Sequence, residues 1–518
     1  MADAAKASSS DFAKPIETLN MSSTSLDGAA VYLHNHSQLS EEVSINPKML
    51  LRKIDWRLMP LAFACSAVQF IDKFTINYAA VMGMNEDLKL VGNNFSNVAT
   101  ALFIATLIAE VPTGKPSFPL IYYTPIILYT FEGYILQKVP AGKWLGMNVI
   151  LWGTAVASTA AVENYRGLLA CRILLGVFEA AMPPCLMLIT GMWYTKSEGA
   201  RRFNIWFCGL GFSQIVGGLV SWGFQQFTAK SIAGWRLMFI VLGVLSIVVG
   251  LFIIILMPDN QMSAKWLSDA EKTAAIQRVA VNQTGIKNTH FKWSHLKELA
   301  LDVQIWLLSV LFILMSISSG IIATYSATII RNLGYSSSHS ALLNMPGGLV
   351  SIASTLSVGY FVGRQGSIWL WISISCMPAV LGGALMSFLP TTNKGGLLVG
   401  MYLVNAVSPS LILIFSWVGA NVAGHTKRVA ASALVSAAFC IGSIIGPQTF
   451  QAKDAPQYIP AKITVLATQF AAIMVAVTAR LYYGWQNSRR QKMANTTIKD
   501  VEWLNLTDKE NPSFRYQY

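Results

Sequence analysis

"LLACRILLGVFEAAMPPCLMLI", residues 168–189, is an apolar stretch with only two charged side chains, Arg172 and Glu179. At 1.5 Å per residue, a helix of this length is about 33 Å long, which is enough to cross the hydrocarbon core of a bilayer. Gly176 and Pro183 share the face of the two charges, because the four residues recur at i, i+4, i+7 and i+11. The stretch therefore predicts a membrane-spanning helix with one charged face.

The composition of the whole chain is that of an integral membrane protein. Of the 518 residues, 53% are hydrophobic and 12% are charged, and the mean hydropathy is +0.48. A soluble domain carries about 25% charged residues. Apolar runs of about twenty residues alternate with short charged loops, and the sequence lacks the alternating segments of a transmembrane β-barrel. We therefore predict an all-α integral membrane fold.

Twelve spans are expected, in two sets of six. The first set lies near Leu58–Val81, Asn97–Val111, Trp144–Ala161, Leu168–Ile189, Phe203–Phe224 and Trp235–Met257. The second lies near Ile305–Ile330, Ala341–Val362, Ile368–Leu389, Gly395–Ala420, Val429–Phe450 and Ile463–Trp485. Two such sets around a polar centre are typical of a pseudo-symmetric transporter with two six-helix bundles.

The distribution of Lys and Arg sets the expected orientation. With both termini in the cytosol, the inner loops hold most of the basic residues and the outer loops hold mostly single ones, as the positive-inside rule requires. The regions are then a cytosolic tail (1–50), a bundle (51–257), a cytosolic central loop (258–304), a second bundle (305–486) and a cytosolic tail (487–518). In the central loop, "SDAE" forms a capping box that predicts a helix from Ser268 to about Val281. We expect a multi-pass protein of the plasma membrane.

Several functional classes are disfavoured. The net charge is +13, but basic residues lie singly or in pairs beside apolar runs, so membrane anchoring explains them better than nucleic-acid binding. The six cysteines fall within apolar runs and show no metal-binding spacing. We expect no catalytic residues, metal, cofactor or nucleic-acid partner, and we expect a monomer in the lipid bilayer.

The first span carries further polar residues in "QFIDKFTINYA", residues 69–79. Gln69, Lys73 and Asn77 recur at every fourth position and share one stripe, with Asp72 beside it. An ionisable residue at this depth costs roughly 2.5–3.5 kcal/mol, so it suggests a function. A cation here can attract an anionic substrate while the carboxylate offsets its charge. The alternative is that Lys73 extends toward the outer surface over a structural Asp72.

The charges of the fourth span need partners from other helices. Arg172 and Glu179 are two turns apart, about 10 Å along the axis, which is too far for a strong direct ion pair. The first span can supply an opposite charge to each. A buried carboxylate without a tight partner suits a group that gains and loses a proton, although a purely structural charge network is the alternative. Three neutral residues could also contact substrate or simply bond between helices: Gln214, Tyr325 and Asn405.

Stretches across the chain resemble the anion:cation symporter family of the major facilitator superfamily, in its fungal allantoate permease branch. They include "FIDKFTINYAAVMGM", "LQKVPAGKWLGMNVILWG", "GHTKR" and "GPQTFQAKDAPQYIPAK", and the resemblance covers about 51–485. It implies proton-coupled import of a small carboxylate by alternating access, such as allantoate, a related ureide acid, or a vitamin or pyridine carboxylate. By position, Lys73 and Arg172 would bind the carboxylate. Glu179 would carry the proton, and Asp72 would assist it.

The loop between the second and third spans departs from the family pattern. In "GYILQKVPAGK" the matching residues are Gly133, Lys138, Gly142 and Lys143, while Gln137 stands where the family has an acid. The resemblance implies that this loop locks conformations, here with one charge interaction fewer. The fifth span lacks the Gly-Pro ending of the antiporter signature, which favours symport. The alternatives are a drug or metabolite exporter and, on weaker grounds because the tails are short, a nutrient sensor.

Residues 115–133, "KPSFPLIYYTPIILYTFEG", interrupt the family pattern. The apolar run is only about fourteen residues, contains Pro119 and Pro125, and would invert the charge bias if it spanned the membrane. Its removal joins "LIAEVPTG" to "YILQKVPAGK" and restores the pattern. We hypothesise that it is a retained intron, with a genuine insertion as the alternative.

Sequencing the transcript tests this hypothesis. These nineteen residues correspond to 57 nucleotides, and we expect mature messages that lack them. A transcript population that keeps these codons throughout would instead establish the insertion.

Overall fold

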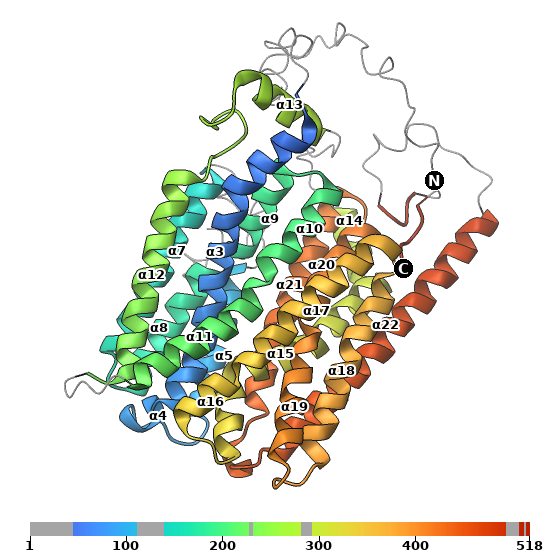
Figure 1. Ribbon diagram of the computed structural model, residues 1–518. Helices are drawn as coiled ribbons and strands as arrows, with labels where there is room; N and C mark the ends of the chain where they lie inside the picture. The colour runs from blue at the N-terminus through green and yellow to red at the C-terminus, as the bar shows by residue number, and fades with distance from the viewer. Residues whose placement is uncertain (1–44, 111–138, 227–231, 281–292, 494–506, 512–513) are drawn as a thin grey trace, which may run out of the picture.

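The computed structural model describes residues 45–110, 139–226, 232–280, 293–493, 507–511 and 514–518 (Figure 1). These residues form helices and connections, with no strand among them, which confirms the all-α prediction. The insertion at 115–133, most of the tail at 1–50, and Gly133, Gln137 and Lys138 of the loop motif lie outside the described residues.

Long helices, several of them broken in two, make up both halves of the chain. The N-terminal half contains α3 (Pro47–Val81), α5 (Asn94–Glu110), α7 (Ala141–Ser158), α8 (Tyr165–Glu179) with α9 (Met182–Trp193), α10 (Lys196–Phe207) with α11 (Gly209–Gln226), and α12 (Gly234–Leu256). The C-terminal half contains α15 (Val303–Asn332), α16 (Ser337–Leu343) with α17 (Met345–Gln365), α18 (Ile368–Phe388), α19 (Lys394–Val404) with α20 (Ser408–Asn421), α21 (His425–Gln448) and α22 (Ile459–Met493). In the described residues, nine helical stretches are long and apolar enough to cross a membrane, which is consistent with twelve spans.

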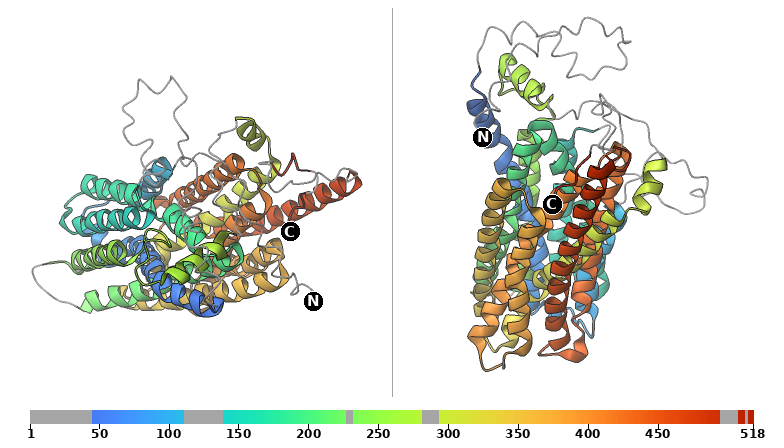
Figure 2. Two further views of the ribbon diagram at one scale, coloured as in Figure 1. Left: turned by 90° about the horizontal axis from the view of Figure 1, so that it is seen from above. Right: turned by 90° about the vertical axis from the view of Figure 1, so that its right-hand side faces the viewer.

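The two halves lie side by side, and the short helices mark the two ends of the molecule (Figures 1 and 2). At one end, α4 (Met84–Asp87) lies near α16. At the other end, α13 (Asp269–Ala280) lies beside the first turns of α3. We call these the α4–α16 end and the α13 end.

The helix α13 begins where the sequence predicts. Ser268 N donates to Glu271 Oε2 at 2.9 Å, and Glu271 N donates to Ser268 Oγ at 3.3 Å, so the capping box is formed. Lys53 Nζ of α3 lies 2.7 Å from Glu271 Oε2. Partial burial opposes ionisation of Glu271, but the ammonium of Lys53 outweighs it and lowers the pKa of Glu271. The central segment is thereby attached to the start of α3.

The predicted fourth span is interrupted at its charged face. Pro183 and Pro184 lie in the first turn of α9, where they supply no backbone N–H to the helix before them. The helical ladder therefore breaks at Ala180 and Ala181, and α8 ends at Glu179. Tyr165–Trp193 still forms one membrane-crossing stretch, as the sequence predicts, and the carboxylate of Glu179 lies at the junction of its two pieces.

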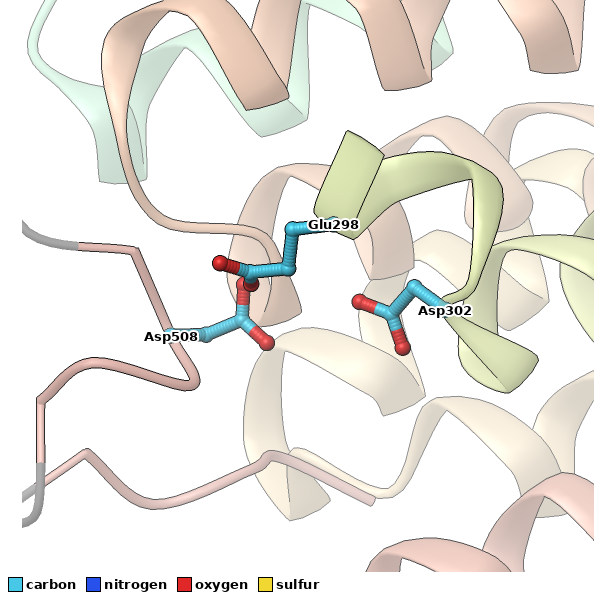
Figure 3. A group of neighbouring side chains, drawn as sticks. All are labelled: Glu298, Asp302 and Asp508. Atoms are coloured by element: carbon cyan, nitrogen blue, oxygen red, sulfur yellow. The ribbon is translucent and has the colours of Figure 1, made fainter. Parts of the chain in front are cut away.

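The carboxylates of Glu298, Asp302 and Asp508 lie close together (Figure 3), and Lys427, from the "GHTKR" stretch, pairs with all three. Its Nζ is 2.7 Å from Glu298 Oε1, 2.6 Å from Asp302 Oδ2 and 2.6 Å from Asp508 Oδ1. Glu298 belongs to α14 (Trp293–Ala300), Asp302 precedes α15, and Asp508 lies near the end of the chain. One ammonium on α21 therefore joins the α14–α15 connection to the segment that contains Asp508, and Lys509 Nζ adds a second positive charge 3.4 Å from Asp302 Oδ1.

The described part of the C-terminal region packs on the second bundle. Gln517 O accepts from Trp417 Nε1 at 3.1 Å and from Asn421 Nδ2 at 2.9 Å, and Gln517 N donates to Asn421 Oδ1 at 2.7 Å. Tyr516 OH donates to Asp508 Oδ2 at 2.8 Å, and burial together with the Asp508 charge raises the pKa of this phenol. This segment is thus held by backbone and side-chain contacts at the α20 terminus.

We expect Lys427→Met to destabilise the purified protein strongly. The substitution keeps most of the side-chain volume but leaves Glu298, Asp302 and Asp508 without their shared cation, and breaking a buried ion pair costs about 3–5 kcal/mol. A thermal melt in detergent should show a clear loss of Tm, and Lys453→Met, at an exposed lysine, should leave the Tm unchanged. Equal melting of the two variants would contradict the structural role of Lys427.

Candidate substrate and proton site

A cavity of about 220 Å³ lies between the two halves. Its described walls come from α3, α5 and α8 to α11 on one side, and from α15, α20 and α21 on the other. The lining includes Met187 of α9, Phe203 of α10 and Leu411 of α20, three helices that lie in the half of the molecule nearer the α13 end (Figure 1). The cavity therefore extends toward the α13 end.

An ion pair from two helices lies in the cavity wall. Lys73 Nζ of α3 is 2.7 Å from Glu179 Oε1 at the end of α8, and Gln69 Nε2 donates to the same oxygen at 2.8 Å. The side chains of Lys73 and Glu179 are 14% and 3% exposed, and all three residues line the cavity. Glu179 Oε2 has no hydrogen-bond partner among the described residues. The structure thus brings together three of the residues that the sequence singles out.

Asp72 and Arg172 lie outside the described cavity lining. Asp72 Oδ2 accepts a hydrogen bond from Trp152 Nε1 at 2.5 Å, and Asp72 is almost fully buried. The guanidinium carbon of Arg172 is 5.8 Å from the centre of the Phe239 ring, and its Nε and Nη2 have no hydrogen-bond partner among the described residues. Among the described residues, no ion pair within 4 Å joins Arg172 to Asp72 or to Glu179.

Trp152 is the residue of this site that the sequence analysis does not identify. It is 1% exposed, lies on α7, and supplies the one side-chain hydrogen bond to Asp72 among the described residues. The available indication is its place in "LQKVPAGKWLGMNVILWG", a stretch that carries the family resemblance. An indole N–H in an apolar helix needs a partner, but the sequence alone does not say which one.

Asn77 and Gln214, predicted as substrate contacts, join the two halves instead of lining the cavity. Asn77 Nδ2 donates to Ser326 Oγ at 2.7 Å, and Ala327 N donates to Asn77 Oδ1 at 3.1 Å. Gln214 Nε2 donates to Asn344 Oδ1 at 3.0 Å. These bonds connect α3 and α11 to α15 and to the start of α17, toward the α4–α16 end.

Tyr325 also forms a hydrogen bond to the other half of the molecule, whereas Asn405 forms one within its own half. The Tyr325 hydroxyl is 2.5 Å from Ser96 Oγ of α5, and its ring stacks on Phe450 with centroids 4.1 Å apart. Asn405 Nδ2 donates to Met401 O at 3.1 Å. Neither residue is part of the described cavity lining. Together with Asn77 and Gln214, Tyr325 closes the α4–α16 end in this conformation.

Two residues of the loop motif fall within the described chain. Gly142 is in the first turn of α7, and Lys143 Nζ is 3.1 Å from Asp259 Oδ2, just beyond α12. The Lys143 side chain is 56% exposed, so this ion pair contributes little stability by itself. It does connect the start of α7 to the chain that leaves α12.

Gly176 allows α5 and α8 to meet next to the ion pair. A Cβ on Gly176 would overlap the backbone oxygen of Leu102 and would lie 2.9 Å from Ala105 Cβ. Thr106 Oγ1 also donates to Gly176 O at 3.1 Å. Backbone atoms cannot give way as flexible side chains do, so the position requires glycine.

Two helical halves around a central cavity, with an ion pair in its wall, define the class of polytopic transporters. The chain belongs to the Major Facilitator Superfamily, whose family model matches residues 62–447. It is therefore a multi-pass membrane transporter of small molecules and not an enzyme.

Relatives and solved structures agree with this assignment. The thiamine pathway transporter THI73 of Saccharomyces cerevisiae is 35% identical over 480 residues, covering 92% of this chain and 87% of the relative. The allantoate permease of the same yeast is 30% identical over 498 residues, covering 92% and 88%. The solved proton:xylose symporter XylE has the same fold, with a TM-score of 0.61 at 14% identity over 82% of this chain and 94% of that one.

We expect Gly176→Ala to reduce both stability and transport. The added methyl group pushes α5 away from α8, and overpacking of this kind costs about 1–3 kcal/mol. Gly191→Ala on α9 is the matched control, since no atom lies within 4 Å of its added Cβ. A thermal melt and an uptake assay should separate the two variants, and indistinguishable behaviour would show that α5 and α8 are not in this close contact.

Proposed function

We propose that the protein is a proton-coupled importer of a small organic carboxylate, which acts by alternating access in the plasma membrane with both termini in the cytosol. The observation that carries the proposal is the Lys73–Glu179 ion pair in the wall of the central cavity. On this orientation the α13 end faces the cytosol, and the described conformation is closed toward the outside.

Competition for Lys73 supplies the coupling in this proposal. While Glu179 is charged, it occupies the ammonium of Lys73 at 2.7 Å. Protonation of Glu179 removes that competitor, and the freed ammonium can form a charge-assisted hydrogen bond to a substrate carboxylate. When the substrate leaves, an unpaired ammonium in an apolar wall is costly, so Glu179 releases its proton and re-forms the pair. The anion and the proton therefore travel together.

We assign supporting roles to the second pair of charges. Asp72, which is held by Trp152 behind the wall, assists Glu179 as a second carboxyl in this proposal. Arg172 is the second candidate ligand for the substrate carboxylate. Its unbonded Nε and Nη2 would reach a substrate only after α8 moves relative to the cavity.

The contacts at the α4–α16 end form the outer gate in this proposal. Opening it breaks the bonds of Asn77, Gln214 and Tyr325 to the other half. These polar groups would then face the outside path, where they can contact an entering substrate. Their predicted binding role therefore belongs to the outward-open state.

We expect Glu179→Gln to abolish proton-driven accumulation while leaving some substrate exchange. Neutral glutamine resembles the protonated acid, so Lys73 stays available to the substrate but no proton is carried. The measurement is uptake of a labelled carboxylate, such as allantoate, into proteoliposomes with an inward proton gradient. Full accumulation by this variant would contradict the role of Glu179.

Two further variants complete this experiment. Glu163→Gln removes a carboxylate that is exposed at the start of α8 and should behave as the unchanged protein. Lys73→Ala should weaken binding of anions specifically, because it removes the charge that attracts them. If the inward proton gradient instead drives the labelled carboxylate out of the proteoliposomes, the protein is an exporter.

A further inference from the structure

We propose that the substrate is an aromatic monocarboxylate, in which one carboxylate is attached directly to a planar ring. This inference rests on the proposed function, because it takes Lys73 as the carboxylate ligand. It narrows the candidate class, which otherwise extends from ureide acids to ring carboxylates.

The walls of the cavity are aromatic on both sides. Nine of the described lining residues are Phe or Trp. Phe70, Phe103 and Phe207 come from the N-terminal half, and Phe312, Phe415 and Phe439 come from the C-terminal half. A planar ring between such walls stacks or packs edge-on against several of them.

These rings pack against one another within each half, and one pair joins the two halves. Phe70 packs edge-on against Phe207, with centroids 5.5 Å apart, and Phe312 packs in the same way against Phe415 at 5.2 Å. Phe439 lies 6.3 Å from Phe103 of the other half. Mutual packing restricts their rotamers, so little side-chain entropy is lost when a ring binds between them.

The cation lies directly among the aromatic rings. Lys73 Nζ is 5.3 Å from the centre of the Phe70 ring and 5.9 Å from that of Phe439. A carboxylate that replaces Glu179 on this ammonium therefore has aromatic faces from both halves beside it. The atoms attached to that carboxylate must occupy the space between Phe70 and Phe439. A ring attached directly to the carboxylate suits this space.

The uncharged polar groups of the described lining are one amide, one thiol and five hydroxyls, on Gln69, Cys440, Thr106, Ser319, Ser416, Ser436 and Ser443. Gln69 Nε2 already donates to Glu179, and Thr106 Oγ1 already donates to Leu102 O at 2.9 Å. A ureide acid presents several amide donors and acceptors, and each of these loses water on entering an apolar site. The lining is mostly apolar, so it offers these groups fewer partners than water does.

Charge limits the substrate to one carboxylate. Among the described lining residues, Lys73 is the one basic side chain and Glu179 the one acidic side chain. In the described conformation Arg172 lies outside the lining, so a second carboxylate on the substrate would have no cation there and would be repelled by Glu179 whenever that residue is charged. The volume suits one ring, since a cavity of about 150 Å³ already accommodates benzene.

Isothermal titration of the full-length protein at mildly acidic pH tests this proposal with five probes: benzoate, cyclohexanecarboxylate, phthalate, allantoate and benzamide. We expect benzoate to bind roughly 3- to 10-fold more tightly than cyclohexanecarboxylate, as aromatic pairing contributes that much. Phthalate and allantoate should bind more weakly than benzoate. Phe439→Leu should remove most of the benzoate preference, and Phe388→Leu, at an exposed ring of α18, should retain it.

The outcomes separate this inference from the proposed function. Tighter binding of allantoate or phthalate than of benzoate overturns the aromatic monocarboxylate and leaves carboxylate import intact. Equal affinity for benzoate and its neutral analogue benzamide overturns the carboxylate role of Lys73, and the proposed function fails with it. Equal affinity for benzoate and cyclohexanecarboxylate overturns the contribution of the aromatic walls.

Discussion

The ion pair between Lys73 and Glu179 is the interaction on which the rest of the site depends. Both charges lie in the apolar centre of a helical bundle, where an isolated charge costs several kcal/mol, so each requires the other. They come from α3 and α8, and the fold must therefore hold these helices together at this level. The partners of this pair can also be replaced. A proton can neutralise Glu179, and an anionic substrate can take the place of Glu179 beside Lys73.

The surrounding structure meets the geometric needs of this pair. The helix break before Pro183 places Glu179 at the end of α8, and Gly176 lets α5 lie against the same face. Trp152 binds Asp72 behind the wall, so the second carboxylate is held away from Lys73. The two halves then close over the cavity at the α4–α16 end, which leaves it extending toward the α13 end.

Lys427 shows how a buried lysine differs when its role is structural. Its ammonium contacts three carboxylates from two segments, whereas Lys73 has one carboxylate partner and lines a cavity. Breaking the Lys427 cluster would leave several buried charges unpaired, so it holds α14, α15, α21 and the C-terminal segment together. A buried lysine with several carboxylate partners thus stabilises the fold, whereas one with a single partner in a cavity wall can exchange that partner for a substrate.

The sequence by itself determined the membrane class, the helical spans, the capping box of α13, the charged residues in the spans and the family. These follow from local quantities, namely hydropathy, periodicity and charge, or from motifs along the chain. Only the tertiary structure decided that Gln69 and Lys73 meet Glu179, that Trp152 binds Asp72, and that Asn77 and Tyr325 join the two halves. Helical periodicity says which residues share a face, but the partner of that face depends on how separate helices pack.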